Sequence, residues 1–191
     1  MTDAKVKAST RDQIIRAFDE LIYRQGFSQT SFAHIAEKVN ISRGNFYYHF
    51  KNKDQILDAV IHLRMETTHK TLSHWELLND TPCKRIACFI DVLNNHQTDI
   101  LRFGCSMANL SNELSRLDHP AQENAIMLFT LYRTWLRRQF ALLGDKQWAD
   151  KRALHLLVQR QGIITIANAL NDSSFLTEET TKLQQWLLSL S

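Results

Sequence analysis

The side chains best suited to bind a charged polymer lie in one short run, residues 42–53. The run reads Ser-Arg-Gly-Asn-Phe-Tyr-Tyr-His-Phe-Lys-Asn-Lys. Cationic, amide and hydroxyl side chains can bind phosphate oxygens and base edges, whereas a helix needs only an apolar stripe to fold. The side chains available for such contacts are Arg43, Asn45, Tyr47, Tyr48, His49 and Lys53. The run therefore predicts a helix that reads nucleic acid.

The alternative is an ordinary surface helix whose aromatic residues belong to the core. Phe46 and Phe50 are four residues apart, so we expect both to be buried. The other aromatic side chains then share the remaining faces with cations. Exposed aromatic groups are unfavourable unless they contact a partner, which favours the nucleic-acid interpretation.

The elements before this run have the order that a helix-turn-helix requires. A first amphipathic helix is expected from Ser9 or Thr10 to Gly26, and a second is capped by Thr30 or Ser31 and ends near residue 39. Asn40 suits a left-handed turn, and Ser42 is a good cap for the third helix. Two short helices joined by three or four residues form this motif.

Composition predicts an all-α protein. The chain has 191 residues, of which 44% are hydrophobic, with only 2 Pro and 5 Gly. Scarce turn residues favour long helices over short strands. Residues 1–55 hold 9 Lys and Arg against 6 Asp and Glu, whereas residues 56–191 hold 14 of each. A neutral second part suits ligand binding or dimerisation better than a second nucleic-acid surface.

We therefore expect a DNA-binding domain at 1–52 and a larger helical domain at 53–191. Asn52 caps a long helix, and Thr81 followed by Pro82 starts another. A helix at 146–170 is apolar on nearly every side in its later half, which predicts burial all round. This helix and the last one exceed what a single chain must bury, so we expect a homodimer. The residues assigned to the dimer interface are Ile164, Leu183, Trp186 and Leu190.

Aromatic and sulfur-containing side chains of the second domain are candidates for lining a ligand pocket. They are Trp75, Phe89, Phe103, Cys105, Met107, Phe129 and Tyr132. A row of aromatic residues is more often core than pocket, so both interpretations stay open.

Residues 9–55 resemble the DNA-binding region of the TetR family of transcriptional repressors. The resemblance rests on Gly26-Phe27, on 30–36 (Thr-Ser-Phe-Ala-His-Ile-Ala) and on 41–53. It implies a three-helix headpiece and a helical body. It also implies a dimer through the last two helices, and release from a palindromic operator when a small apolar or reactive ligand enters the body.

The resemblance also implies residue roles. Arg43, Gly44 and Asn45 occupy positions that read base edges, Tyr47 and His49 positions that contact backbone or bases, and Lys53 a position that binds phosphate. Thr30 and Ser31 occupy a phosphate-facing helix cap. The chain departs from the family pattern at Ala33, His34 and Asn40, where a longer side chain, an acid and Gly are usual. These departures bear on the operator sequence.

Residues 104–114 begin Gly-Cys and resemble the start of a helix in one TetR subgroup, some members of which sense electrophiles or oxidants. A thiol at a helix N-terminus has a lowered pKa and a larger thiolate fraction. The alternative, that Cys105 simply packs as a small hydrophobe, is favoured.

A small helical enzyme or a metal-binding protein is the alternative from another class. His62, Glu66 and His69 share one helix face, but three ligands on one helix make a poor chelate. No P-loop, G-x-S-x-G, H-E-x-x-H or dinucleotide motif is present. We expect no catalytic residue, metal or cofactor. The cysteines Cys83, Cys88 and Cys105 form no C-x-x-C pair, and no leader or membrane span is evident, so we expect a cytoplasmic protein.

Overall fold

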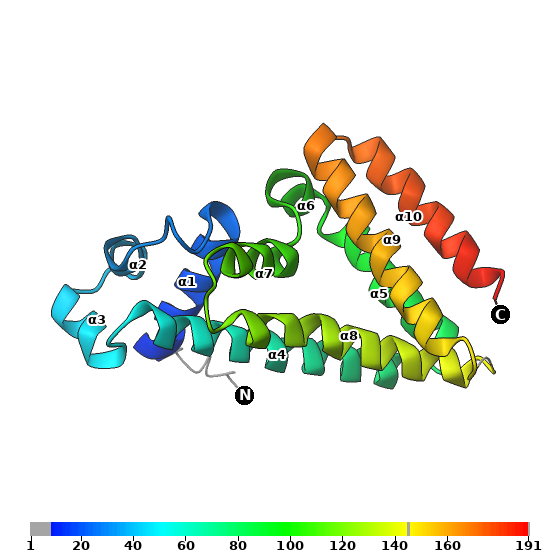
Figure 1. Ribbon diagram of the computed structural model, residues 1–191, viewed down its shortest axis with the longest axis horizontal. Helices are drawn as coiled ribbons and strands as arrows, with labels where there is room; N and C mark the ends of the chain where they lie inside the picture. Colours follow the sequence, from blue (N-terminus) through cyan, green and yellow to red (C-terminus); the bar gives the residue numbers. More distant parts are fainter. Residues whose placement is uncertain (1–8, 145, 191) are drawn as a thin grey trace, which may run out of the picture. The chain divides into compact units, whose positions relative to one another are not determined.

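A computed structural model of the chain describes residues 9–144 and 146–190, and within them it contains ten helices and no strand (Figure 1). The predicted all-α class is confirmed. The helices are α1 (Thr10–Gln25), α2 (Phe32–Val39), α3 (Arg43–His49), α4 (Lys53–Leu78), α5 (Pro82–Asn95), α6 (Gln97–Phe103), α7 (Ser106–Arg116), α8 (Gln122–Leu142), α9 (Ala149–Leu170) and α10 (Ser173–Leu188).

The helices group into two compact units whose boundaries differ from the predicted division at residues 52 and 53. The first unit holds the chain up to Arg64 together with 109–125, and the second holds 65–108 and the chain from residue 126 onward. The reason is the hydrophobic core of the first unit. Ile56, Leu57 and Val60 of α4 and Leu114 of α7 are fully buried in it. The headpiece helices alone do not close this core.

Side-chain caps set the helix starts of the first unit, as the sequence predicted. The hydroxyls of Ser9, Ser31 and Ser42 accept backbone N–H bonds at the starts of α1, α2 and α3. Phe46 and Phe50 are buried, which confirms their place in the core. Gly26 ends α1 with φ +89°, a left-handed value that other residues rarely adopt.

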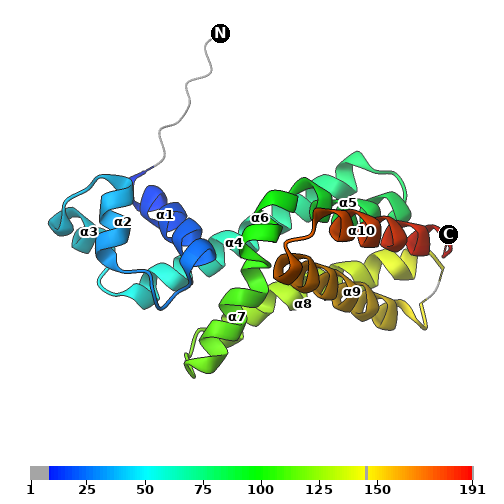
Figure 2. The same cartoon turned by 90° about the horizontal axis from the view of Figure 1, so that it is seen from above.

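In the second unit, α9 and α10 run side by side in opposite directions, as both views show (Figures 1 and 2). The helix α10 also packs against α5, and α6 packs against α9. Thr81 caps α5, with Pro82 in its first turn as expected. The short helix α6 was not expected as a separate element; it begins after His96, whose φ of −116° and ψ of 23° interrupt the helical path.

Candidate nucleic-acid interface

The turn between α2 and α3 is held by backbone geometry. Asn40 adopts φ 57° and ψ 51°, the left-handed conformation that Asn tolerates better than most residues. Its N–H donates to the carbonyl of Glu37, and the N–H of Ile41 donates to the carbonyl of Ala36 at 3.0 Å. These bonds use carbonyls at the end of α2 and direct the chain straight into α3. Asn therefore replaces the usual Gly here without loss of the turn.

The outward face of α3 carries most of the side chains assigned to DNA reading. Arg43, Gly44, Asn45 and Tyr47 are exposed, Tyr48 is 79% exposed, and His49 is half-buried with its ring 5.0 Å from the ring of Tyr48. No Asp or Glu occurs between Lys38 and Lys53. This face is therefore both open and free of fixed negative charge.

Tyr47 differs from Tyr48 in its surroundings. Its ring packs edge-on against Phe32 at 5.7 Å and against Phe46 at 5.8 Å, and its carbonyl accepts a bond from Nζ of Lys51. Tyr48 contacts only His49 among the ring pairs of the described residues. Tyr47 thus helps to fix α3 on the core, whereas the Tyr48 ring is free to contact a partner.

Ser31 and Thr30, which the sequence analysis assigned together to the cap of α2, have different surroundings in the structure. Ser31 is exposed and its Oγ accepts from the N–H of His34. Thr30 is 1% exposed, because its Oγ1 donates to the carbonyl of Gly26 at 2.7 Å and accepts from Gln25. In this structure the Thr30 hydroxyl is buried in the turn, so of these two residues Ser31 is the one whose side chain lies at the surface.

Lys53 is also engaged inside the unit. Its Nζ lies 4.1 Å from the ring centroid of Phe27, and burial lowers the pKa of Lys53 although the carboxylates of Glu113 and Asp54 oppose that shift. In this structure Lys53 packs at the start of α4, and its contact with a phosphate stays a prediction.

Sequence reasoning missed the group that anchors this region, Glu113 of α7. Its Oε2 accepts from the N–H of Phe27 and its Oε1 from the N–H of Ser28, both at 2.7 Å. Burial alone would raise the pKa of the Glu113 carboxyl. The two backbone hydrogen bonds and the charge of Lys53 together outweigh burial, so the pKa lies below its ordinary value. Nearby, His119 packs on the ring of Phe27 at 5.3 Å. An acid after Gly-Cys was visible in the sequence, but its partners were not.

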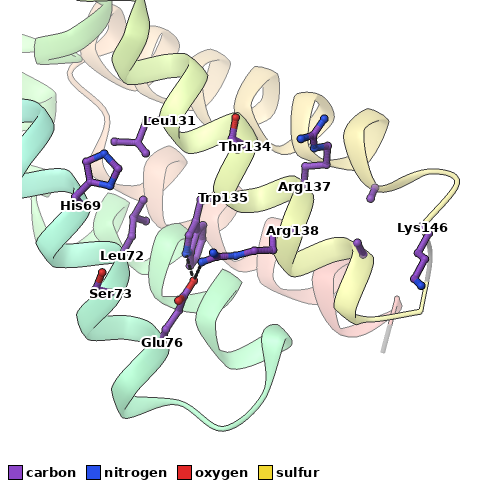
Figure 3. A pocket seen from close by; sticks show the side chains of 12 residues that line it. His69, Leu72, Ser73, Glu76, Leu131, Thr134, Trp135, Arg137, Arg138 and Lys146 are labelled. Carbon is purple, nitrogen blue, oxygen red and sulfur yellow. Dashed lines mark hydrogen bonds and ion pairs between the residues drawn. The ribbon is translucent and has the colours of Figure 1, made fainter.

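In the second unit, a cavity of about 720 Å³ lies between the later half of α4, α8 and the start of α9 (Figure 3). Glu76 lies at one side, where it accepts bonds from Trp135, Arg138 and Gln139. The full lining is His69, Leu72, Ser73, Glu76, Leu131, Thr134, Trp135, Arg137, Arg138, Ala141, Lys146 and Ala149. None of the residues predicted to line a pocket is among them.

Five of the seven predicted pocket residues instead lie in or against the hydrophobic core of the second unit: Trp75, Phe89, Cys105, Met107 and Tyr132. Phe89 is fully buried, and its ring lies 5.1 Å from that of Tyr132. Trp75 packs against Trp135, and Met107 packs against the core. Phe103 and Phe129 are half-buried. The core interpretation, which the sequence left open, accounts for Phe89.

Cys105 immediately precedes α7 and is buried. Its Sγ accepts a bond from Nε2 of Gln161 at 3.3 Å. Cys83 and Cys88 are half-buried. Access by a reagent therefore favours Cys83 and Cys88 over Cys105.

The residues predicted for the dimer interface are only partly available. Ile164 is 2% exposed and Leu183 is 5% exposed within one chain, so each can offer little surface to a partner; Trp186 and Leu190 are half-buried. Within one chain, the later half of α9 is buried on only part of its circumference. Every fourth residue of that helix forms an exposed stripe, which we call the α9 stripe: Leu154, Val158, Gly162, Ile166 and Leu170.

Among the described residues no cluster of His, Cys, Asp and Glu could hold a metal ion, and Glu66 is paired with Lys70. Within the same part of the chain, no helix is long and apolar enough to cross a membrane.

A three-helix unit whose last helix is open, cationic and preceded by a tight turn defines a helix-turn-helix DNA-binding protein. Residues 14–60 match the sequence profile described as "Bacterial regulatory proteins, tetR family". Residues 14–60 therefore form the DNA-binding region of a TetR-family transcriptional regulator, and the homologues of the chain are transcriptional regulators, not enzymes.

Relatives support this assignment over different lengths. An uncharacterised HTH-type transcriptional regulator of Lactococcus lactis is 28% identical over 88% of each chain. The regulator TtgR of Pseudomonas putida is 37% identical over 34% of this chain and 29% of its own. A TetR regulator of Legionella pneumophila has a similar fold, with a TM-score of 0.82 at 22% identity over 94% of this chain and 98% of that one. The reduced form of NemR from E. coli also has a similar fold, with a TM-score of 0.77 at 14% identity over 93% of this chain and 96% of that one.

Proposed function

We propose that the protein is a homodimeric repressor that leaves a palindromic operator when a small molecule enters its second unit. The observation that carries the proposal is the open, acid-free face of α3. A cationic helix that carries no carboxylate of its own attracts the phosphate backbone, and its exposed amide and guanidinium groups can then read base edges. As a DNA-binding regulator it would act in the bacterial cytoplasm.

The residues that we assign to DNA differ from those first predicted. Arg43, Gly44 and Asn45 would approach base edges, with Tyr48 and the exposed Ser31 positioned for phosphates. Gly44 suits a close approach, because a Cβ built there meets only the Ser42 hydroxyl, at 3.9 Å. Tyr47 and His49 would contribute mainly from the edges of this surface.

The α9 stripe supports the dimer. A run of large apolar side chains in one line is unusual on the surface of a monomer. Glycine at its centre allows the backbone of a partner helix to approach, and nothing lies within 4 Å of a Cβ built at Gly162. Two copies packed through this stripe would present two α3 helices to successive major grooves, about 34–36 Å apart.

The test is selection of DNA from a random duplex pool with the full-length protein. We expect enrichment of a palindrome, bound by two chains, with affinity that falls steeply as salt rises. Arg43→Ala should lose about 1–3 kcal/mol of discrimination at one base position. Arg116→Ala, an exposed arginine of α7, is the matched control and should bind as the wild type does. Failure to enrich any sequence would contradict the proposal.

A further inference from the structure

A buried guanidinium in the second unit leaves two of its three nitrogens without a hydrogen-bond partner. Arg160 of α9 is 7% exposed, and its Nε and Nη1 are fully buried without a hydrogen-bond partner. They are the only such side-chain atoms among the described residues. Arginine does not lose its proton in proteins, so the burial cannot be relieved by neutralisation. An isolated buried charge is strongly unfavourable unless an anion or hydrogen bonds compensate it.

Among the described residues, the guanidinium of Arg160 contacts an aromatic face. The guanidinium carbon of Arg160 lies 4.8 Å from the ring centroid of Phe89, which is fully buried, and the Phe89 ring in turn contacts Tyr132. A cation over an aromatic ring gains electrostatic attraction but leaves the N–H donors unused.

Two carboxylates of the second unit are engaged with other side chains. Asp91 of α5 accepts from Gln184, and Asp150 of α9 is bound by Arg133. No ion pair joins Arg160 to any described acid. Nε and Nη1, with three N–H groups between them, are therefore available to an acceptor from outside the chain.

We propose that Arg160 binds the carboxylate of a small, otherwise apolar effector in the second unit. One guanidinium matches a single negative charge, whereas a doubly charged phosphate would stay half compensated. The rings of Phe89 and Tyr132 and the buried aliphatic core around them suit an aromatic or aliphatic body behind that carboxylate. This inference rests on the proposed function, because it names the chemistry of the molecule that would enter this unit.

The cavity in Figure 3 is a separate place with its own cations. Arg137 and Lys146 line it and Arg160 does not. A carboxylate held there would depend on Arg137 instead. This difference gives the experiment its control.

The test needs no DNA. The Tm of the full-length protein is measured with benzoate, 4-phenylbutyrate and octanoate, each against its alcohol, because a ligand that binds only the folded state raises Tm. We expect at least one carboxylate to raise Tm well beyond its alcohol. Arg160→Met should abolish the increase, Arg160→Lys should keep part of it, and Arg137→Met should keep all of it. Without ligand, Arg160→Met should melt no lower than the wild type, because an unpaired buried charge is gone.

Three results would overturn the proposal: carboxylates that act no better than their alcohols, a Tm increase that survives Arg160→Met, or one that is lost only with Arg137→Met. The first comparison uses the wild type alone, so it holds even where a variant fails to fold. A second measurement adds the active carboxylate to the protein–operator complex. A Tm increase without DNA release would support the Arg160 site and contradict the effector-released repressor, so the two proposals fail separately.

Discussion

Glu113 and Phe27, 86 positions apart in the chain, are joined by a 2.7 Å hydrogen bond from the Phe27 N–H to the Glu113 carboxylate. The neighbouring N–H of Ser28 binds the second oxygen of the same carboxylate. Both donors belong to the turn between α1 and α2, and the acceptor belongs to α7. A single side chain therefore fixes the turn from which the helix-turn-helix begins.

Glu113→Gln should weaken the first unit, because an amide can accept only one of the two bonds and carries no charge. We expect a loss of roughly 1–2 kcal/mol at pH 7, a value reduced for the partial exposure of the group. Urea unfolding followed by circular dichroism measures it, and hydrogen exchange at the Phe27 and Ser28 amides locates it. The exposed Glu123→Gln should change neither.

The Glu113 contribution should also depend on pH. The folded-state pKa of Glu113 is lowered, so its stabilisation is fully present above the ordinary carboxyl value of about 4.3. It is lost as pH falls through the lower folded value. The difference between wild type and Glu113→Gln should therefore shrink in urea unfolding below pH 4. A difference that grew with acid would contradict this assignment.

Gly26→Ala should cost more than Gly144→Ala, although both glycines have left-handed φ values, +89° and +99°. Each alanine brings about 1–2 kcal/mol of backbone strain. Only at Gly26 does the new Cβ meet another group, Oε2 of Glu113 at 3.1 Å. In the Glu113→Gln background the excess cost at Gly26 should change, because the two sites are in contact. Equal losses of stability in the two alanine variants would remove Glu113 from the explanation.

Tyr48→Ala and Tyr47→Ala should separate binding from folding. Tyr48 is exposed, so its removal should weaken operator binding and leave the unfolding curve unchanged. Tyr47→Ala should also lower stability, because its ring packs on Phe32 and Phe46. Fluorescence anisotropy of labelled operator and thermal unfolding monitored by circular dichroism measure the two effects. Full affinity in Tyr48→Ala would remove Tyr48 from the interface.

Val158→Glu should convert the dimer into monomers and lower operator affinity. A charge in the α9 stripe cannot be buried against a second copy without a large desolvation cost. Leu77→Glu is the control, since Leu77 is 84% exposed and lies outside the stripe. Sedimentation velocity distinguishes the two. A dimer that persists in Val158→Glu would place the interface elsewhere.

Cys105 should react with iodoacetamide more slowly than Cys83 and Cys88 in the folded protein. Its sulfur is buried and bonded to Gln161, whereas the other two thiols are partly accessible. Site mapping by mass spectrometry after short exposure gives the order of the three rates. If Cys105 reacted first, the thiol-sensor interpretation of the Gly-Cys segment would gain support over packing.

Local signals predicted the local structure. The caps at Ser42 and Thr81, the turn at Asn40 and the burial of Phe46 and Phe50 each depend on neighbours a few residues away, so the sequence contains them. Glu113 could not be paired with Phe27 in this way, because the contact joins distant segments.

Periodicity failed where a helix offered no contrast between its faces. The later half of α9 is apolar all round, so Ile164 and Ile166 look equivalent in sequence, yet one is buried and the other is 45% exposed. The burial of Arg160 could not be predicted for a different reason. A lone cation in a helix is normally solvated, and only the packing shows that this one is not.

His34 closes the N-terminus of α2 with a ring nitrogen, since its Nδ1 accepts from the N–H of Ser31 at 3.3 Å. A capping box usually has Glu or Gln at this position. Glutamate would have placed a negative charge next to the exposed Ser31, where we propose that the phosphate backbone approaches. The ring nitrogen of His34 forms the same cap without a carboxylate, so no negative charge is added where a polyanion would approach. His34 therefore keeps the hydrogen bond that stabilises the start of α2, and it avoids the repulsion that a glutamate at the same position would exert on DNA.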